Sequence, residues 1–263
     1  MAPPSALTPA ERSSLVAAAA RLRLLILETV YQAGSGHIGG ALSEVELLVA
    51  LYYRALRVDP GRPEWPERDR FVLSKGHGGL GLVAALVDRG FVPKAELAGY
   101  GRTGSRLGMH LDHRKVPGVE LSTGSLGHGL GVAVGMALGA RLKGWPSRTV
   151  CLLSDGECYE GSTWEAALSA PAYRLGRLVA LVDDETLSGK LAKTVFEKML
   201  ATVNQIWTAA GIQLGKVRVL ELTGDTGKKF HFLDAVDSPN PDNELLQVYQ
   251  AAAKVQGASP AAT

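Results

Sequence analysis

An acidic residue at the end of a short apolar run is the first candidate for chemistry in this chain. Val150 to Leu153 are apolar, and Ser154-Asp155-Gly156 follow directly. Such a run predicts a buried strand of a parallel sheet, and open α/β sheets bind ligands outside the carboxyl ends of their strands. A carboxylate there suits Mg²⁺ bridging a diphosphate, and the glycine lets a polyanion come close. An ordinary Asp-Gly turn between a strand and a helix is the alternative interpretation.

Four histidines lie in glycine-rich stretches elsewhere in the chain. His37 lies in the run from Gly34 to Gly40, His77 follows Gly76, and His110 belongs to the Gly- and Arg-rich stretch 101–119. His128 lies in a fourth run, 124–129, which opens a helical pattern and so offers free backbone N–H groups to an anion. Any one histidine is more often structural, but glycines that allow close approach beside several imidazoles favour a shared ligand site.

The elements that must position these loops alternate between helices and strands. Helical patterns are expected over 8–34, 43–54, 80–88, 93–98, 129–143 and 162–169, and strands over 71–73, 150–153 and 177–182. Thr8-Pro9-Ala10-Glu11 is a capping box for the first helix, and Ser43 is expected to cap the second. The run 34–40 is too glycine-rich to predict regular structure. The order predicts an α/β fold, a parallel sheet flanked by helices with right-handed crossovers.

The amino-acid composition limits the class of protein to which the chain can belong. The chain has 263 residues, 46% of them apolar, and a net charge of +2. This length fits one large α/β domain or two small ones, and the charge gives no argument for nucleic acid or an anionic membrane as a partner. No apolar run suggests a membrane span or an export signal. Cys151 and Cys158 lack metal-ligand spacing, so reduced thiols in a cytoplasmic protein are expected.

Four motifs in this order carry a family resemblance. They are Gly34-Ser35-Gly36-His37-Ile38-Gly39-Gly40, Ser74-Lys75-Gly76-His77-Gly78, the run from Pro117 to Gly129, and Asp155-Gly156-Glu157-Cys158-Tyr159-Glu160-Gly161. Together they resemble the diphosphate-binding half of transketolase, particularly members whose two halves are separate chains. The resemblance covers residues from about 10 to 183.

The resemblance implies a thiamine diphosphate enzyme that moves a two-carbon ketol unit between sugar phosphates. Asp155 would bind Mg²⁺, with Gly156 and Glu157 at the diphosphate. His77 and the turn Gly124-Ser125-Leu126 would line the cofactor, and the three catalytic histidines would be His37, His77 and His110. Glu160 would lie at a subunit interface.

One position departs from the family pattern. The family completes the metal motif with Asn about thirty residues after the Asp, where this chain has Glu185, and Leu187 is the candidate for a backbone carbonyl ligand. Glu185 would then contact both metal and cofactor, but it brings a negative charge beside a diphosphate. Two unit charges about 4 Å apart interact by about 4 kcal/mol at an effective dielectric near 20, and attraction to Mg²⁺ acts in the opposite direction. A non-catalytic paralogue is therefore an alternative, as is an enzyme similar to 1-deoxyxylulose-5-phosphate synthase.

Beyond Leu187 the resemblance ends. We therefore expect a thiamine diphosphate-binding domain at 1–187 and an unassigned segment at 188–263, with a strand at 217–222 and helices near 188–210 and 244–255. The family binds its cofactor between a diphosphate half and a pyrimidine half, and this length leaves no room for the second. An active enzyme would require a pyrimidine-domain partner chain, in a homo- or hetero-oligomer that acts on sugar phosphates.

Overall fold

The computed structural model describes residues 7–183 and the two strands 216–223 and 229–236. Helices cover most of the first part: α1 (Pro9–Ala33), α2 (Ile38–Ser43), α3 (Val45–Ala50), α4 (Gly79–Asp88), α5 (Gly129–Leu142) and α6 (Gly161–Ala172). Shorter turns are the π-helical η1 (Leu51–Ala55) and the 3-10 helices η2 (Gly76–Gly78), η3 (Lys94–Gly99) and η4 (Asp155–Tyr159). The strands are β1 (Arg70–Leu73), β2 (Thr149–Ser154), β3 (Leu178–Asp183), β4 (Lys216–Thr223) and β5 (Lys229–Val236).

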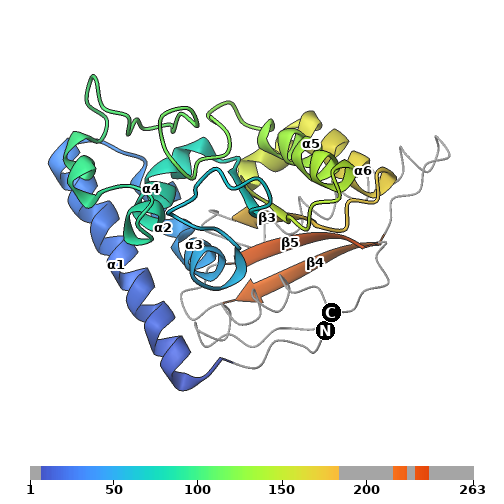
Figure 1. Cartoon of the computed structure of the whole chain (residues 1–263), viewed down its shortest axis with the longest axis horizontal. Helices are drawn as coiled ribbons and strands as arrows, with labels where there is room; N and C mark the ends of the chain where they lie inside the picture. The colour runs from blue at the N-terminus through green and yellow to red at the C-terminus, as the bar shows by residue number, and fades with distance from the viewer. Residues whose placement is uncertain (1–6, 184–215, 224–228, 237–263) are drawn as a thin grey trace.

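The strands form one sheet in the order β1-β2-β3-β5-β4. Figure 1 shows β3, β5 and β4 beside one another. The strands β1, β2 and β3 run parallel, with Phe71 opposite Val150 and Leu152 opposite Leu181. β5 runs antiparallel to β3, and β4 antiparallel to β5. The predicted parallel sheet flanked by helices is therefore confirmed for β1, β2 and β3.

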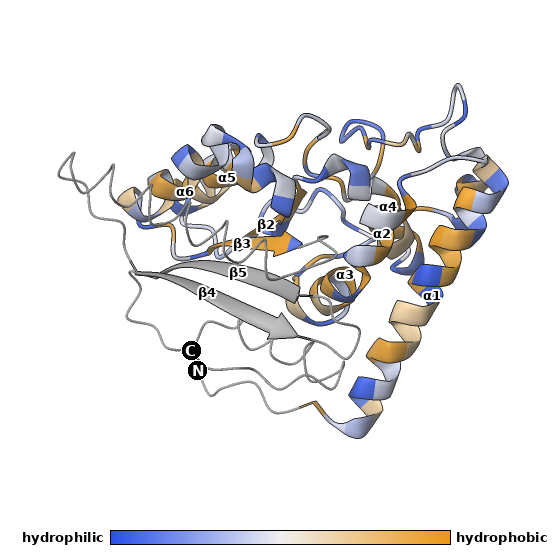
Figure 2. Ribbon diagram, turned by 180° about the vertical axis from the view of Figure 1, so that it is seen from behind, coloured by the Kyte–Doolittle hydropathy of each residue, from blue (hydrophilic) through white to orange (hydrophobic). Residues whose placement is uncertain are grey.

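Both faces of the parallel strands are covered by helices. Phe71 and Leu152 belong to the core shared with α1, α3 and α4, whereas Val72, Cys151 and Leu153 belong to the core shared with α5 and α6. Because successive side chains of a strand point to opposite faces, both sets must be apolar, which explains the continuous apolar runs. Figure 2 shows the hydrophobic colour of β3, with α5 and α6 to one side of it and α3 to the other.

The long first helix begins and ends where the sequence predicts. The Thr8 hydroxyl accepts a hydrogen bond from the Glu11 N–H at 3.2 Å, and the Glu11 carboxylate accepts one from the Thr8 N–H at 2.8 Å. This reciprocal capping box satisfies two of the N–H groups that a helix start leaves without partners. At the other end Gly34 adopts φ 71°, a left-handed conformation that glycine takes without strain.

The glycine-rich run and the second helix differ from the prediction. Ile38–Ser43 forms α2, so Gly39 and Gly40 are helical. Ser43 does not cap α3, because Glu44 occupies that position without a side-chain hydrogen bond to the helix start. The Ser43 hydroxyl instead contacts the Gly40 carbonyl at 3.0 Å and the Asp183 carboxylate at 2.5 Å. The prediction of irregular structure is correct for residues 34–37 and wrong for 38–40, and the prediction of Ser43 as a helix cap is wrong. Burial of Gly40 and Ser43 in α2 outweighs their low helix propensity.

The remaining elements largely follow the pattern of the sequence. The strand predicted at 217–222 is confirmed as β4, and the short helix near residue 93 forms as the 3-10 helix η3. Strand β5 had no counterpart among the sequence predictions and was missed. The helices expected near 188–210 and 244–255 lie outside the described residues.

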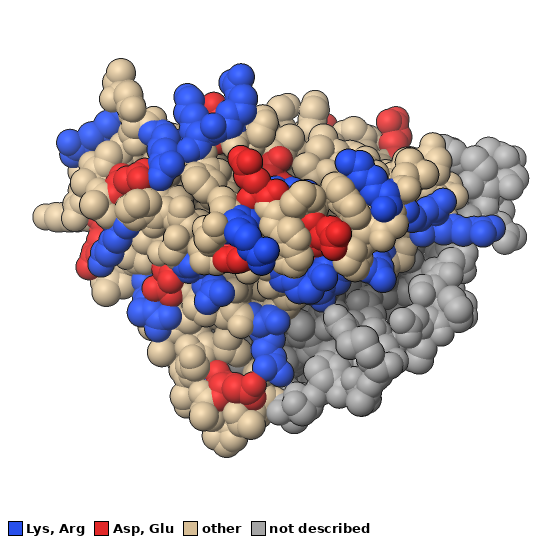
Figure 3. Space-filling model, viewed as in Figure 1, with Lys and Arg blue, Asp and Glu red and all other residues tan. Residues whose placement is uncertain are grey.

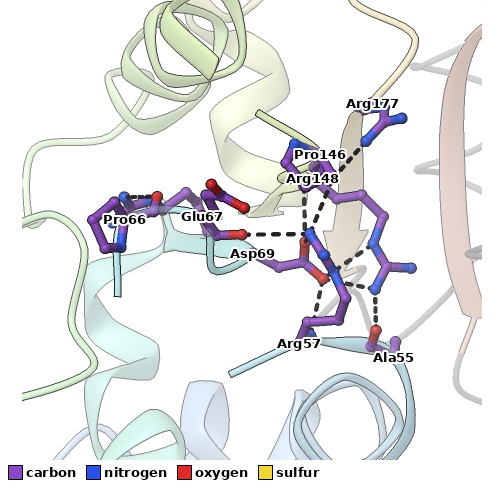
Figure 4. A network of polar contacts seen from close by, with 9 residues as sticks. Ala55, Arg57, Pro66, Glu67, Asp69, Pro146, Arg148 and Arg177 are labelled. Atoms are coloured by element: carbon purple, nitrogen blue, oxygen red, sulfur yellow. Dashed lines mark hydrogen bonds and ion pairs between the residues drawn. The ribbon is translucent and has the colours of Figure 1, made fainter. Parts of the chain in front are cut away.

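A buried aspartate organises the amino end of the sheet (Figure 4). Asp69, directly before β1, is 0% exposed and accepts hydrogen bonds from the backbone N–H groups of Arg57 and Arg148, both at 2.9 Å. The two guanidinium groups also reach its carboxylate, at 3.0 and 2.6 Å. Burial acts to raise the pKa of Asp69, but the hydrogen bonds from Arg148 and Arg57 prevail and lower it. This network joins the starts of β1 and β2, at the end of the sheet opposite the candidate site.

Charges of both signs are mixed on the surface. On the face shown in Figure 3, basic and acidic side chains alternate and form no extended patch of one sign among the described residues. None of the described helices combines the length and the apolar character that crossing a lipid bilayer requires.

Candidate functional site

The carboxyl ends of the parallel strands bring the sequence motifs to one edge of the sheet. β1 leads into the turn with His77, β2 into η4 with Asp155, and β3 ends at Asp183. Asp155 and Gly156 are both partly exposed, and a Cβ added to Gly156 would meet only the Ser154 hydroxyl, at 3.8 Å. The backbone at Gly156 is therefore unobstructed, while its contact with a diphosphate stays a prediction.

Three histidines from separate segments converge at this edge. The ring centroids of His37 and His77 are 6.2 Å apart, and those of His37 and His110 are 5.7 Å apart, both in edge-to-face orientation. His37 lies directly before α2, His77 in η2, and His110 in the long loop after η3. His37 and His110 are exposed and His77 partly so. The structure thus forms one accessible imidazole cluster from the residues predicted to be catalytic.

The glycine-rich loop before α5 lies against this cluster. Gly124 and Ser125 are exposed and Leu126 partly so. A Cβ on Gly124 would stand 3.3 Å from His110 Nδ1, and one on Gly76 would stand 2.7 Å from the carbonyl carbon of Thr123. Only glycine permits this backbone contact between the turn after β1 and the loop, so the predicted cofactor-lining residues are held beside the histidines.

The buried side chain of Glu157 holds the glycine-rich loop through hydrogen bonds. The side chain is 0% exposed and accepts hydrogen bonds from the N–H groups of Gly127 at 3.0 Å and Ser154 at 2.9 Å. It also accepts a short hydrogen bond from the Ser74 hydroxyl, which in turn accepts one from Gly129 N–H at 3.1 Å. Glu157 therefore joins the ends of β1 and β2 to the start of α5. Its prediction as a direct cofactor contact stays a prediction.

Hydrogen bonds of Ser122 hold the loop that follows His110. The Ser122 hydroxyl donates to Asp112 at 3.3 Å, accepts from the His113 N–H at 3.0 Å and contacts His113 Nδ1 at 2.9 Å. The serine hydroxyl thus stands between the histidine and the aspartate, unlike in a hydrolytic triad, where the histidine is central. These contacts serve to hold residues 112–113 against the segment that leads to Gly124.

A buried charged cluster behind the histidines was missed by sequence reasoning. Lys75 and Glu44 are 0% exposed, and Asp183 is 1% exposed. Lys75 Nζ lies 2.6 Å from Asp183 Oδ2 and 3.8 Å from Glu44 Oε2. The one sequence signal for this cluster was the position of Lys75 inside one of the four motifs, next to the end of a strand. Burial of Lys75 was not expected, because lysines are almost never fully buried unless they are paired.

The roles predicted for Glu160, Glu185 and Leu187 stay predictions. Glu160 is exposed and follows η4 directly. Glu185 and Leu187 lie outside the described residues. Within the described part of the chain no three His, Cys, Asp or Glu side chains are grouped so as to hold a metal ion on their own. Cys151 and Cys158 are buried and unlinked, and burial raises the pKa of the Cys151 thiol, so it is a poor nucleophile and ligand.

Comparison with known proteins decides the family. The family model "Transketolase, thiamine diphosphate binding domain" matches residues 14–204. The chain belongs to the transketolase family. A 6-deoxy-6-sulfo-D-fructose transketolase subunit from Clostridium sp. (strain MSTE9) is 47% identical over 162 residues, which are 62% of this chain and 59% of that protein. One of the apulose-4-phosphate transketolase subunits, from Phocaeicola vulgatus, is 42% identical over 204 residues, which are 77% of this chain and 70% of that protein.

Solved transketolases share the fold. The structure of transketolase from Leishmania mexicana superimposes with a TM-score of 0.62 at 31% identity, over 65% of this chain and 27% of that one. The match to separate subunits covers most of their length, whereas the match to this transketolase covers about a quarter. This chain therefore corresponds to the thiamine diphosphate-binding part of a transketolase.

The residues at the strand ends fit the cofactor that the family implies. An exposed glycine turn opening α5 and the unobstructed backbone at Gly156 offer N–H groups and space to a diphosphate. Asp155 offers the hard carboxylate oxygen that Mg²⁺ prefers. The described part of the chain thus has one carboxylate that would suit the metal and an open glycine-rich edge that would suit a diphosphate.

Proposed function

We propose that this chain is the diphosphate-binding subunit of a two-chain transketolase that acts on sugar phosphates in the cytoplasm, with Mg²⁺ and thiamine diphosphate. The single observation that carries the proposal is the convergence of His37, His77 and His110 beside the Gly124 loop. Relatives that are transketolase subunits support the division into two chains. The partner would be a pyrimidine-domain chain, and Glu160 would lie at the interface with it.

Each residue has a distinct role in this proposal. Asp155 would hold Mg²⁺, the backbone of Gly124, Ser125 and Gly156 would bind the diphosphate, and Leu126 would line the cofactor. When bound, thiamine diphosphate would supply the electron-accepting chemistry for the transfer of the two-carbon unit. Its binding domain is residues 1–187, with 188–263 as a separate segment.

The histidines act on the protons of the substrate. An imidazole can donate or accept a proton near neutral pH. His37 and His110, the two exposed members of the cluster, would hold the substrate hydroxyls and move their protons, while His77 faces the cofactor. Proton transfer by a positioned group contributes typically about 10²- to 10⁴-fold to the rate.

Position 185 favours a second candidate, a non-catalytic subunit that keeps the fold but binds no cofactor. Glu185 stands where the family pattern has Asn, and Leu187 is the candidate carbonyl ligand after it. If Glu185 acts as a ligand, its carboxylate joins Asp155 at Mg²⁺. If it repels the diphosphate, the site is inactive in the natural chain.

Calorimetry on the chain mixed with its pyrimidine-domain partner tests both candidates. With Mg²⁺ and thiamine diphosphate the wild-type pair should bind the cofactor, and Asp155→Ala should abolish that binding. Absence of binding by the wild-type pair would exclude the enzyme. Glu185→Asn is the sharper variant: if it creates or strongly improves binding, the natural glutamate opposes the cofactor and the non-catalytic candidate is correct.

A further inference from the structure

The buried cluster around Lys75 links three separate parts of the candidate site. Lys75 Nζ donates to the Gly40 carbonyl at 3.1 Å, to the Ser43 hydroxyl at 3.1 Å and to Asp183 Oδ2 at 2.6 Å. The Ser43 hydroxyl also donates to Asp183 Oδ2. The three hydrogen bonds use the full donor capacity of an ammonium group.

Each contact of this cluster belongs to a segment that carries or adjoins a site residue. Lys75 is two residues before His77, in the turn that ends β1. Gly40 and Ser43 lie on α2, a six-residue helix that begins directly after His37. Asp183 is the last residue of β3 and pairs in register with Ser154, beside Asp155. One ammonium group therefore connects the two histidine segments to the carboxyl edge of the sheet.

Glu44, between α2 and α3, packs against the start of α4. Its carboxylate occupies the space beside Gly78 and Gly81, where an added Cβ would stand 2.8 Å and 3.2 Å from the Glu44 carboxyl carbon. Glu44 Oε2 lies 3.8 Å from Lys75 Nζ. The glycines of this segment thus leave room for an acidic side chain that packs on the same lysine.

The cost of burying these charges indicates a positional role. A buried ion pair often adds little net stability, because desolvation offsets the attraction, and apolar side chains of similar size can replace it without loss. The pair of Lys75 and Asp183 nevertheless requires specific geometry, since the three ammonium protons must each reach an acceptor in a site closed to water. That requirement sets α2, the turn after β1 and the end of β3 at one relative position.

We propose that Lys75 is the positioning residue that sets His37 and His77 relative to each other and to the carboxyl edge of the sheet. The importance of this positioning for catalysis rests on the proposed function. The effect of Lys75 on the placement of the histidines is independent of that function. Without Lys75, α2 loses the polar links to the turn after β1 that run through Gly40 and Ser43. The His37 ring would then move against His77.

The test compares four forms of the full chain: wild type, Lys75→Met, Lys75→Met/Asp183→Asn, and Asp69→Asn. Methionine keeps most of the length of lysine without its charge, and the double variant also removes the charge of the carboxylate that faces it. Asp69→Asn is the matched control, because Asp69 is a buried ion-paired aspartate at the opposite end of the sheet. The measurements are the thermal midpoint and the NMR signals of the ring C2–H groups. The chain has six histidines, so single His→Gln variants suffice to assign these signals.

A positional role and a purely stabilising role give different results. We expect Lys75→Met to lower the thermal midpoint and the double variant to regain part of the loss, because the charge of Asp183 is removed while the buried carboxylate of Glu44 remains. The signals of His37 and His77 should differ from wild type in both variants and remain unchanged in the less stable Asp69→Asn. Wild-type histidine signals in the double variant would overturn the proposal.

Kinetics add a readout that separates this inference from the proposed function. In the active complex the double variant should lose roughly 10- to 100-fold in kcat/KM for the sugar phosphate, the order of loss expected from misplacing a catalytic group by about 1 Å. An unchanged kcat/KM in that complex would count against the positioning role. If the wild-type complex is inactive, the proposed function fails, and the NMR comparison still decides the role of Lys75.

Discussion

Replacing Glu157 by Gln tests whether one buried carboxylate holds the glycine-rich loop in place. The two side chains have nearly the same shape, but one carboxylate oxygen becomes an NH₂ group. At Oε2 this group would face the Ser154 N–H, which now donates at 2.9 Å, and at Oε1 it would face the Gly127 N–H, which donates at 3.0 Å. In either orientation two donors oppose each other inside a fully buried site.

The expected loss follows from this geometry. A buried N–H left without an acceptor costs about 1–3 kcal/mol. With a urea m-value of about 2 kcal/mol/M, the denaturation midpoint should fall by about 0.5–1.5 M. Hydrogen exchange adds a local measurement, since the amide protons of Gly127 and Ser154 should exchange faster than in wild type.

The control is the same substitution on the outer side of α6. Glu165 is exposed, so Glu165→Gln should leave the urea midpoint unchanged. If Glu157→Gln and Glu165→Gln have the same midpoint and the same amide exchange at Gly127, the carboxylate does not hold the loop.

The structure makes two further predictions about stability. Asp69→Asn should cost about 2–4 kcal/mol at neutral pH, less than for a fully enclosed pair because its arginines are partly exposed. Because the folded-state pKa of Asp69 is lowered, this stability difference from wild type should be complete above the unfolded-state pKa of about 3.9 and should vanish as the pH falls through the folded-state pKa. Urea titrations over a pH series measure the difference, with Glu64→Gln at an exposed position as the control. A difference that persists at low pH would contradict the assignment. Gly129→Ala should destabilise the chain by about 1–3 kcal/mol, because its Cβ would stand 2.8 Å from the Cα of the serine that follows β1. Gly131→Ala on the same helix meets nothing within 4 Å and should be neutral or stabilising by up to about 1 kcal/mol, so equal thermal midpoints for the two variants would refute the close contact.

Local patterns in the sequence determined most of the elements and the identity of the motif residues. The capping box at Thr8 and the apolar run at Val150 act through neighbours within four residues, so their structure could be predicted. The parallel order of β1, β2 and β3 also followed, because helices alternate with strands over this part of the chain. β5 was missed, although it pairs antiparallel with β4, the strand directly before it in the chain.

The tertiary structure alone decided how the site is held together. Ser43 meets Asp183 across 140 residues, Lys75 meets Asp183 across 108, and Gly127 meets Glu157 across 30. No periodicity or cap encodes such contacts, so the sequence identified His37 and His77 but missed Lys75 and assigned Ser43 a wrong role. The physical reason is burial: a lysine or serine enclosed by folding must find polar partners wherever the fold places them, and only the folded chain brings those partners within hydrogen-bonding distance.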